Sequence, residues 1–348
     1  MNWRRFISVG LIGLFAAIFI PHWMQITDLI GVLRQGRLAW LAAGLAIQLL
    51  WFINQTALYQ SIYRLLKMPA QVNRLLPIVL ASNFVNFATP TASLGALPLF
   101  LDDARQHGLD EGSVTLTNVL RVCLNLAWFS IPLSFSLAVL FFGHMLRPYH
   151  LIAAAILLAS TVLMMAGLVL AGLRPDGFAR LLERMASCVS HSGQHVLKRD
   201  LIDKGRANYF AHQFSAAAVA LWAGRRHLVR PWIHTMLLDA LELAVLLVMF
   251  RAFPAVGPSL SFTQLAAGYT LGVLFSVVAI TPQGLGVVEG TLVAVFTHLG
   301  LPMERAAVVM LAYRGLSFWL PLLAGFVALR WVRGLGKPTA NVEHAASG

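Results

Sequence analysis

The stretch ITPQGLGVVEG, residues 280–290, decides how the rest of the chain is interpreted. It places a proline, two glycines and a glutamate (Pro282, Gly284, Gly286 and Glu289) in a region that is otherwise as apolar as a bilayer core. A lipid-facing helix does not accommodate this combination, because proline and glycine interrupt helices and a carboxylate is costly in hydrocarbon. The stretch therefore predicts a break in the backbone at membrane depth.

The composition of the whole chain is that of a membrane protein. Of its 348 residues, 58% are hydrophobic and 11% are charged, with a mean hydropathy of +0.74, whereas soluble domains carry about 25% charged residues. The net charge of +12 comes from short basic segments between apolar runs. This distribution is typical of membrane orientation and argues against nucleic-acid binding. We predict one membrane domain, residues 1–333, and a disordered tail, 334–348.

Six apolar runs are long enough to cross about 30 Å of hydrocarbon at about 1.5 Å per residue. They are 6–22, 38–59, 114–142, 149–173, 232–253 and 303–332. The one long polar segment, 174–231, is a basic linker, and within it we expect 208–223 to form a helix on the membrane surface. The predicted fold class is an all-α polytopic membrane protein.

Two further apolar regions are interrupted by a Thr-Pro pair. The run 75–89 ends at Thr89-Pro90 and is followed by 92–101, and the run 262–280 ends at Thr281-Pro282 and is followed by 283–299. As a helix, 75–89 is only about 22 Å long, which is too short to cross. We predict two re-entrant helical hairpins, because broken backbone in a membrane requires protein or a water-filled cavity around it. The sequence leaves open whether 208–223 and 262–280 cross fully.

The two hairpins belong to a predicted internal repeat with halves at about 38–142 and 232–332. Gly108-Leu109 follows Thr89-Pro90 at the same spacing as Gly300-Leu301 follows Thr281-Pro282, and an arginine follows each glycine at nearly equal distance. If both termini and the basic linker are cytoplasmic, most of the 26 Lys and Arg residues lie inside. The hairpins then enter from opposite sides, as in transporters built from inverted repeats.

The arginines of the repeat, Arg121 and Arg314, fall within predicted spans. A charge at the centre of a membrane helix costs about 2.5–3.5 kcal/mol and requires a partner. Candidate partners are Asp239, Glu242 and Glu289, and the first two share a helix face at i, i+3. One interpretation is structural ion pairing. A second is a polar cavity in which the planar guanidinium groups bind the phosphate of an anionic lipid headgroup. A third is that Arg121 alone extends its side chain to the membrane surface.

Neutral polar residues near the first hairpin tip, Asn83 and Asn86, either line the same cavity or cap the broken backbone. We find no nucleotide-binding loop, nucleophile motif or complete metal-ligand set. We therefore expect no cofactor, no metal and no catalytic activity.

Several of these motifs resemble one membrane family. TPQGLGVVEG (281–290), LGLPMERA (299–306) and AYRGLSFWLP (312–321) are similar to the second-half signature of the lysylphosphatidylglycerol synthase transmembrane, or flippase-like UPF0104-type, family. NFVNFATPTASLGA (83–96) resembles its first-half signature, with a departure at 93–98. The resemblance implies a multi-pass bacterial inner-membrane protein without the soluble synthase domain. It also implies a cavity lined by Glu289, Arg314, the turn from Thr281 to Gly286, Arg121 and Asn86.

These observations favour a lipid translocase that moves an anionic, aminoacylated or glycosylated lipid between leaflets. Its partners would be membrane lipids and a separate enzyme that makes the transported lipid. Two alternatives remain open: a non-transporting lipid-binding subunit of a lipid or polysaccharide synthesis complex, and an integral membrane lipid-modifying enzyme. The sequence leaves open which lipid is moved, the direction and driving force of transport, and the oligomeric state.

Overall fold

A computed structural model describes residues 31–89, 94–142, 146–181, 184, 204–253, 260–278 and 282–335. The predicted first span 6–22, the hairpin residues Pro90 and Thr281, and the tail from 336 onward lie outside these ranges. Every regular element in the described part is a helix, in agreement with the predicted all-α class.

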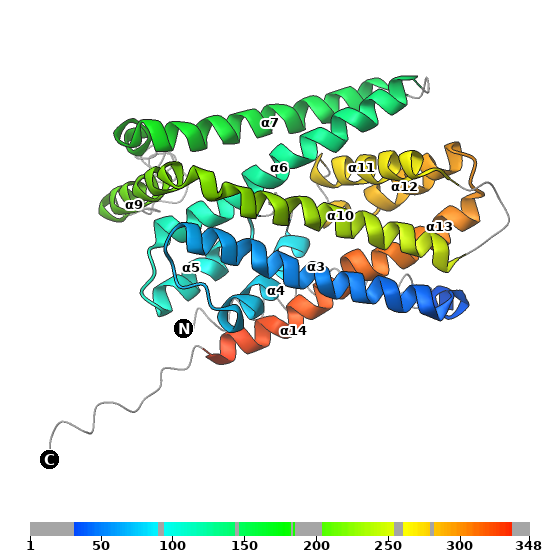
Figure 1. The fold of residues 1–348 in the computed structure, drawn as a ribbon, viewed down its shortest axis with the longest axis horizontal. Helices are drawn as coiled ribbons and strands as arrows, with labels where there is room; N and C mark the ends of the chain where they lie inside the picture. Colours follow the sequence, from blue (N-terminus) through cyan, green and yellow to red (C-terminus); the bar gives the residue numbers. More distant parts are fainter. Residues whose placement is uncertain are drawn as a thin grey trace, which may run out of the picture.

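The helices end close to the proline and glycine positions in the sequence (Figure 1). They are α3 (Leu38–Leu65), α4 (Val72–Ala88), α5 (Leu97–Gln106), α6 (Glu111–Phe142), α7 (Pro148–Leu173), α9 (Lys204–Ala223), η1 (Arg225–Leu228), α10 (Val229–Ala252), α11 (Phe262–Val278), η2 (Pro282–Gly284), α12 (Val287–His298), α13 (Met303–Arg314), η3 (Gly315–Trp319) and α14 (Leu320–Leu335). Whereas η1 and η2 are 3₁₀ turns, η3 is a π-helix.

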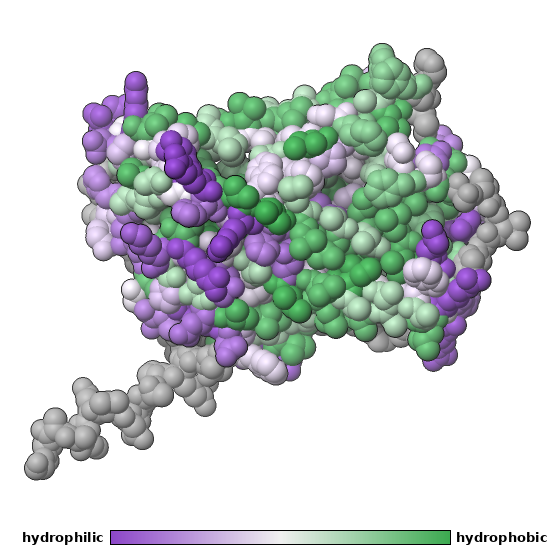
Figure 2. Space-filling model, in the orientation of Figure 1, coloured by the Kyte–Doolittle hydropathy of each residue, from purple (hydrophilic) through white to green (hydrophobic). Residues whose placement is uncertain are grey.

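Five stretches of helix in the described residues are long and apolar enough to cross a membrane. They are Leu38–Leu65, Glu111–Phe142, Pro148–Leu173, Arg225–Ala252 and Met303–Val332, and they correspond to five of the six predicted spans. The surface of the molecule fits this reading, because a broad apolar band separates hydrophilic residues at its two ends (Figure 2). The chain is therefore a multi-pass membrane protein.

Both interrupted regions form pairs of short helices. In the first, α4 has 17 residues and α5 has 10, and in the second, α11 has 17 residues and α12 has 12. At about 1.5 Å per residue none of them reaches the roughly 30 Å of a hydrocarbon core. The two pairs extend toward opposite ends of the molecule (Figure 1). The helix α5 lies toward the end that contains α9, and α11 and α12 lie toward the other end. We call these the α5–α9 end and the α12 end.

The Gly-Leu pairs of the predicted repeat have the same local structure. Gly108 ends α5 with a φ of +63°, and Gly300 ends α12 with a φ of +97°. In both, the leucine N–H donates to the carbonyl five residues earlier, from Leu109 to Ala104 at 2.8 Å and from Leu301 to Phe296 at 3.0 Å. This is the glycine C-cap of a helix that must stop before a new one begins.

Each half packs one of its short helices against a helix of the other half. The first helices of the halves, α3 and α10, lie side by side (Figure 1). The short helix α4 packs along α14 of the second half, and α11 packs against α6 of the first half. Each interrupted region is therefore held by the long helix of the other half.

The helix α9 packs differently from our expectation for 208–223. Its apolar residues Ala211, Phe214, Ala217, Ala218 and Leu221 are buried, and the helix packs against α6 and α7. At the crossing with α6, a Cβ on Gly112 would lie 2.5 Å from the backbone nitrogen of Phe214. Much of the face that we expected to contact lipid is covered by protein instead.

The α4–α14 crossing depends on Gly325, because a Cβ there would lie 2.5 Å from the Leu80 carbonyl oxygen and 2.7 Å from the Phe84 nitrogen. We expect Gly325→Leu to lower the free energy of unfolding by roughly 1–3 kcal/mol, as over-packing does elsewhere. Thermal unfolding in detergent measures this. Gly167→Leu is the matched control, because a Cβ there meets no atom within 4 Å, and equal melting of the two variants would contradict the prediction.

Candidate functional site

The turn between α11 and α12 uses backbone conformations that favour glycine. Gln283, Gly284 and Gly286 have φ values of +46°, +67° and +80°. At Gly284 a Cβ would lie 2.8 Å from the Cα of Ser276 on α11. The two glycines thus allow the chain to reverse tightly beside α11, which explains why they interrupt an apolar region.

Glu289 connects this turn to the next helix. Its Oε2 accepts a hydrogen bond from the backbone N–H of Gly286 at 2.7 Å, so it caps the first turn of α12. Its Oε1 accepts a hydrogen bond from Nε of Arg314 at 2.6 Å. One carboxylate therefore fixes the turn and forms an ion pair with α13.

Arg314 is buried at the junction of α13 and the π-helix η3. Only 6% of the residue is exposed, and it lies about 17 Å from the start of α13, near the middle of the span. A second guanidinium nitrogen, Nη2, donates weakly to the Gln283 carbonyl at 3.4 Å. The guanidinium also lies over the ring of Phe318, 4.7 Å from its centroid.

Phe318 links this site to the other interrupted region. Its ring stacks on Phe87 of α4 at 5.7 Å, with an angle of 6° between the ring planes. Leu285 of the turn packs in the same apolar cluster, and η2 contacts α4. The inner ends of the two helix pairs therefore meet beside Arg314.

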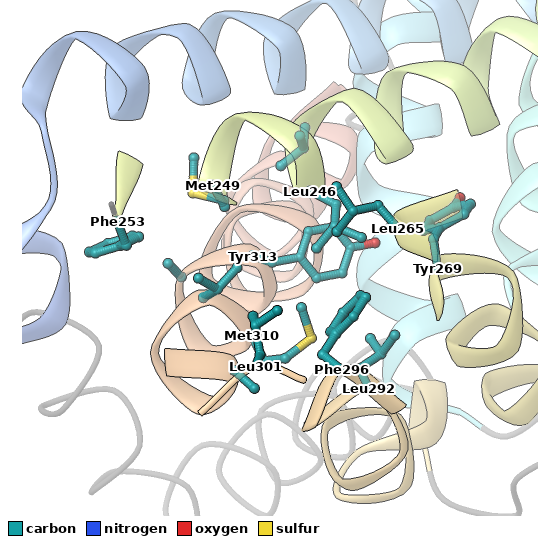
Figure 3. Close-up of a cluster of buried hydrophobic side chains, with 14 of the residues drawn as sticks. Leu246, Met249, Phe253, Leu265, Tyr269, Leu292, Phe296, Leu301, Met310 and Tyr313 are labelled. Carbon is teal, nitrogen blue, oxygen red and sulfur yellow. The ribbon is translucent and has the colours of Figure 1, made fainter. Parts of the chain in front are cut away.

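Two more acidic residues lie on α10 near this ion pair. Glu242 faces the hydroxyl groups of Tyr269 and Tyr313 and lies within electrostatic range of Arg314. Figure 3 shows Tyr269 of α11 and Tyr313 of α13 above Leu292 and Phe296, and all four residues belong to one apolar cluster. The cluster supports one side of the acidic region.

Asp239 lies one turn before Glu242 and faces the indole of Trp128. Oδ2 of Asp239 and Nε1 of Trp128 are both buried, so the carboxyl and the indole N–H face each other away from solvent.

The corresponding region of the first half contains Arg121 and several buried neutral polar groups. The guanidinium of Arg121 lies 5.8 Å from the Tyr59 ring centroid, and the Tyr59 hydroxyl donates to Asn118 Oδ1 at 3.2 Å. Asn83 forms a reciprocal amide pair with Gln55, at 2.8 and 2.9 Å. Amides and a phenol therefore hold α3, α4 and α6 together beside Arg121.

Asn86 caps the start of the second short helix. Its Oδ1 accepts a hydrogen bond from the backbone N–H of Ala96 at 3.0 Å. Asn86 therefore caps the start of α5, as Glu289 caps the start of α12. Of the two roles that we considered for Asn86, the structure shows backbone capping.

The structure thus assembles the predicted residues into two groups. Arg314, Glu289 and Glu242 lie together, with Asp239 one turn away. In the other group, Arg121 and Ser82 both contact Tyr59, and Ser82 directly precedes Asn83 on α4. Thr89 ends α4, Pro282 begins η2, and Pro90 and Thr281 lie outside the described residues.

Several polar residues at these sites were missed by the sequence analysis. Tyr59, Tyr269, Tyr313 and Gln55 supply the contacts above, and Gln48 is fully buried with neither side-chain polar atom hydrogen-bonded in the described part of the chain. A glutamine in an apolar span is itself a signal, because an amide without a partner is costly in hydrocarbon.

The Glu289–Arg314 pair can be measured as a coupling free energy. Arg314→Gln leaves a carboxylate without its ion partner, and we expect it to lower the free energy of unfolding by roughly 3–5 kcal/mol. Glu289→Gln keeps an acceptor for Gly286 and removes only the charge. Denaturant unfolding of both single variants and the double variant should give a coupling free energy of at least about 1 kcal/mol. If the loss of stability in the double variant equals the sum of the two single losses, the pair contributes no coupling.

Comparison with known proteins agrees with the membrane architecture. The chain is 25% identical over 118 residues to a UPF0104 membrane protein of Methanothermobacter thermautotrophicus, and the alignment covers 34% of each chain. Residues 6–325 match the family described as Lysylphosphatidylglycerol synthase TM region. Because that match covers most of the chain, the protein belongs to the lysylphosphatidylglycerol synthase transmembrane-region family.

Proposed function

We propose that this protein is a membrane lipid translocase that moves a lipid with an anionic, aminoacylated or glycosylated headgroup between leaflets. The observation that carries the proposal is the Glu289–Arg314 pair. It places a guanidinium that is 6% exposed near the middle of a span, at the tip of an interrupted helix. Charges at this depth are costly and are characteristic of transport pathways.

The chemistry of the site suits a headgroup. A guanidinium offers a planar set of N–H donors that binds phosphate or carboxylate in bidentate fashion. Glu289 and the nearby Glu242 provide carboxylates that suit an amino group or sugar hydroxyls of the same headgroup. We place the acyl chains in the surrounding lipid and expect no catalytic step.

The arrangement of the two halves supports alternating access. The interrupted regions lie toward opposite ends (Figure 1), the turn η2 of the second region contacts α4 of the first, and α5 and α12 end in the same glycine cap. Two re-entrant hairpins related by inversion would account for these features. With the positive charges inside, the α5–α9 end is cytoplasmic in a bacterial inner membrane, and both chain ends are cytoplasmic.

Lipid movement tests the proposal directly. In liposomes with fluorescent anionic, aminoacylated and isoprenoid lipids, chemical quenching of the outer leaflet measures the rate of translocation. We expect Arg314→Gln and Glu289→Gln to lower the rate by roughly tenfold or more, since each removes a charge-assisted hydrogen bond from the pathway.

The double variant Glu289→Gln/Arg314→Gln separates transport from simple ion pairing. A purely structural pair predicts that the neutral double variant recovers activity, and we expect that it does not. Arg330→Gln is the matched control, because Arg330 is exposed near the end of α14 over Phe326. Wild-type rates in all of these variants would refute the proposal.

The inverted topology has its own test in a variant lacking Cys123 and Cys188. Single cysteines replace His107, at the end of α5, and Met303, which is 69% exposed at the start of α13. His107 lies just after α5 and Met303 lies shortly after α12, and these short helices correspond in the proposed repeat. If the repeat is inverted, a membrane-impermeant maleimide should label the two cysteines from opposite sides of oriented vesicles. Labelling of both from one side would exclude inversion.

A further inference from the structure

A groove at the α12 end is separate from the Glu289–Arg314 pair. It has a volume of about 460 Å³ and lies between Leu140 of α6, the start of α7 and the helices α11 and α12. This volume lies within the range of about 300–1,000 Å³ that is typical of ligand sites.

One stripe of α12 forms the length of the groove. Val287, Gly290, Thr291, Ala294 and His298 line it, and this spacing places them along one face of the helix. A Cβ on Gly290 would meet no atom within 4 Å, so the groove is open there. Leu271 and Phe275 of α11 form much of the apolar wall.

The charged side chains in the lining are basic. Arg147 lies exposed at the start of α7, and His298 lies at the end of α12. Nδ1–H of His298 donates to the Ala294 carbonyl at 2.8 Å, so Nε2 is directed to other partners.

His150 adds a neutral donor at the same end. Its Nδ1 accepts a hydrogen bond from the Arg147 N–H at 3.1 Å, so its Nε2 carries the proton in the neutral ring. The groove therefore combines an apolar length with donors and positive charge at one end.

This end of the groove lies where two of the candidate spans end. One of these spans ends at Phe142 and the next begins at Pro148, and Tyr149, which is 55% exposed, lines the groove. Tyrosine side chains are enriched at the level of lipid headgroups. An occupant with an apolar part and an anionic part at this level is a membrane lipid.

We infer that the groove binds a phosphate-bearing membrane lipid, with its phosphate at Arg147 and His298 and an acyl chain along α12 toward Gly290. The site rests on the proposed function in one respect: in the orientation proposed above it lies in the outer leaflet, and its inner end adjoins Glu289 along the chain. It is the place where a lipid waits before or after passing the ion pair.

The test uses phosphatidylglycerol that carries a photoreactive diazirine on its acyl chain. The protein is kept in maltoside micelles, so that no host phospholipid competes, and the label on residues 287–298 is quantified by mass spectrometry. A diacylglycerol probe with the same diazirine lacks the phosphate. We expect its labelling to be about tenfold weaker at equal concentration, because the charge-assisted hydrogen bonds are lost.

Two variants remove the two parts of the site. Arg147→Gln combined with His298→Gln removes the positive charge, and Gly290→Leu fills the apolar length. Each should lower labelling about tenfold. Arg251→Gln and Gly167→Leu are the matched controls and should label like wild type, because neither residue lines the groove.

Three results would overturn the proposal. Labelling unchanged in both variants would show that the lipid binds elsewhere. Equal labelling by the diacylglycerol probe would show that the phosphate is not recognised. Displacement of the probe by glycerol phosphate as effectively as by phosphatidylglycerol would identify a soluble anion as the ligand. Arg314→Gln should keep the labelling. If it keeps translocation as well, the central pathway fails and the groove still stands.

Discussion

The constraint on which this structure depends is the need to satisfy polar groups where an apolar region of the chain is interrupted. Glu289 satisfies it twice, because one carboxylate oxygen caps the backbone at Gly286 and the other binds Arg314. The same contact pairs two opposite charges, either of which would be costly alone in an apolar environment. The interrupted helix and the buried arginine are therefore one feature, since each supplies what the other lacks.

This feature also organises the packing between the halves. The side chain of Arg314 lies on Phe318, and Phe318 stacks on Phe87 at the inner end of α4. The turn at 282–286 is therefore connected to α4 in two ways, directly through η2 and through the contacts of Arg314 and Phe318. The helices show the same kind of contact between the halves, because α4 packs against α14 and α11 packs against α6.

The sequence was informative where the signal is local. Proline and glycine positions located both pairs of short helices, and run length separated them from the five spans. The sequence was uninformative where an outcome depends on how helices are rotated against one another. Nothing in the residues before η3 predicts a π-helix, and the pairing of Asn83 with Gln55 requires that α3 and α4 face each other at one register. The burial of α9 and the groove along α12 depend on neighbours distant in sequence, so composition could not reveal them.

The two halves share an architecture but divide the chemistry unequally. Asn86 and Glu289 cap corresponding short helices, yet one is neutral and the other is charged and bound to Arg314. Arg121 lies beside the ring of Tyr59, whose hydroxyl donates to Asn118, whereas Arg314 is bound by a carboxylate and has Glu242 within electrostatic range. An amide pair such as Gln55–Asn83 holds helices at fixed register without a net charge. The two short helices α5 and α12 thus begin at caps of different chemistry, because the cap from Asn86 is neutral and the cap from Glu289 is charged and paired.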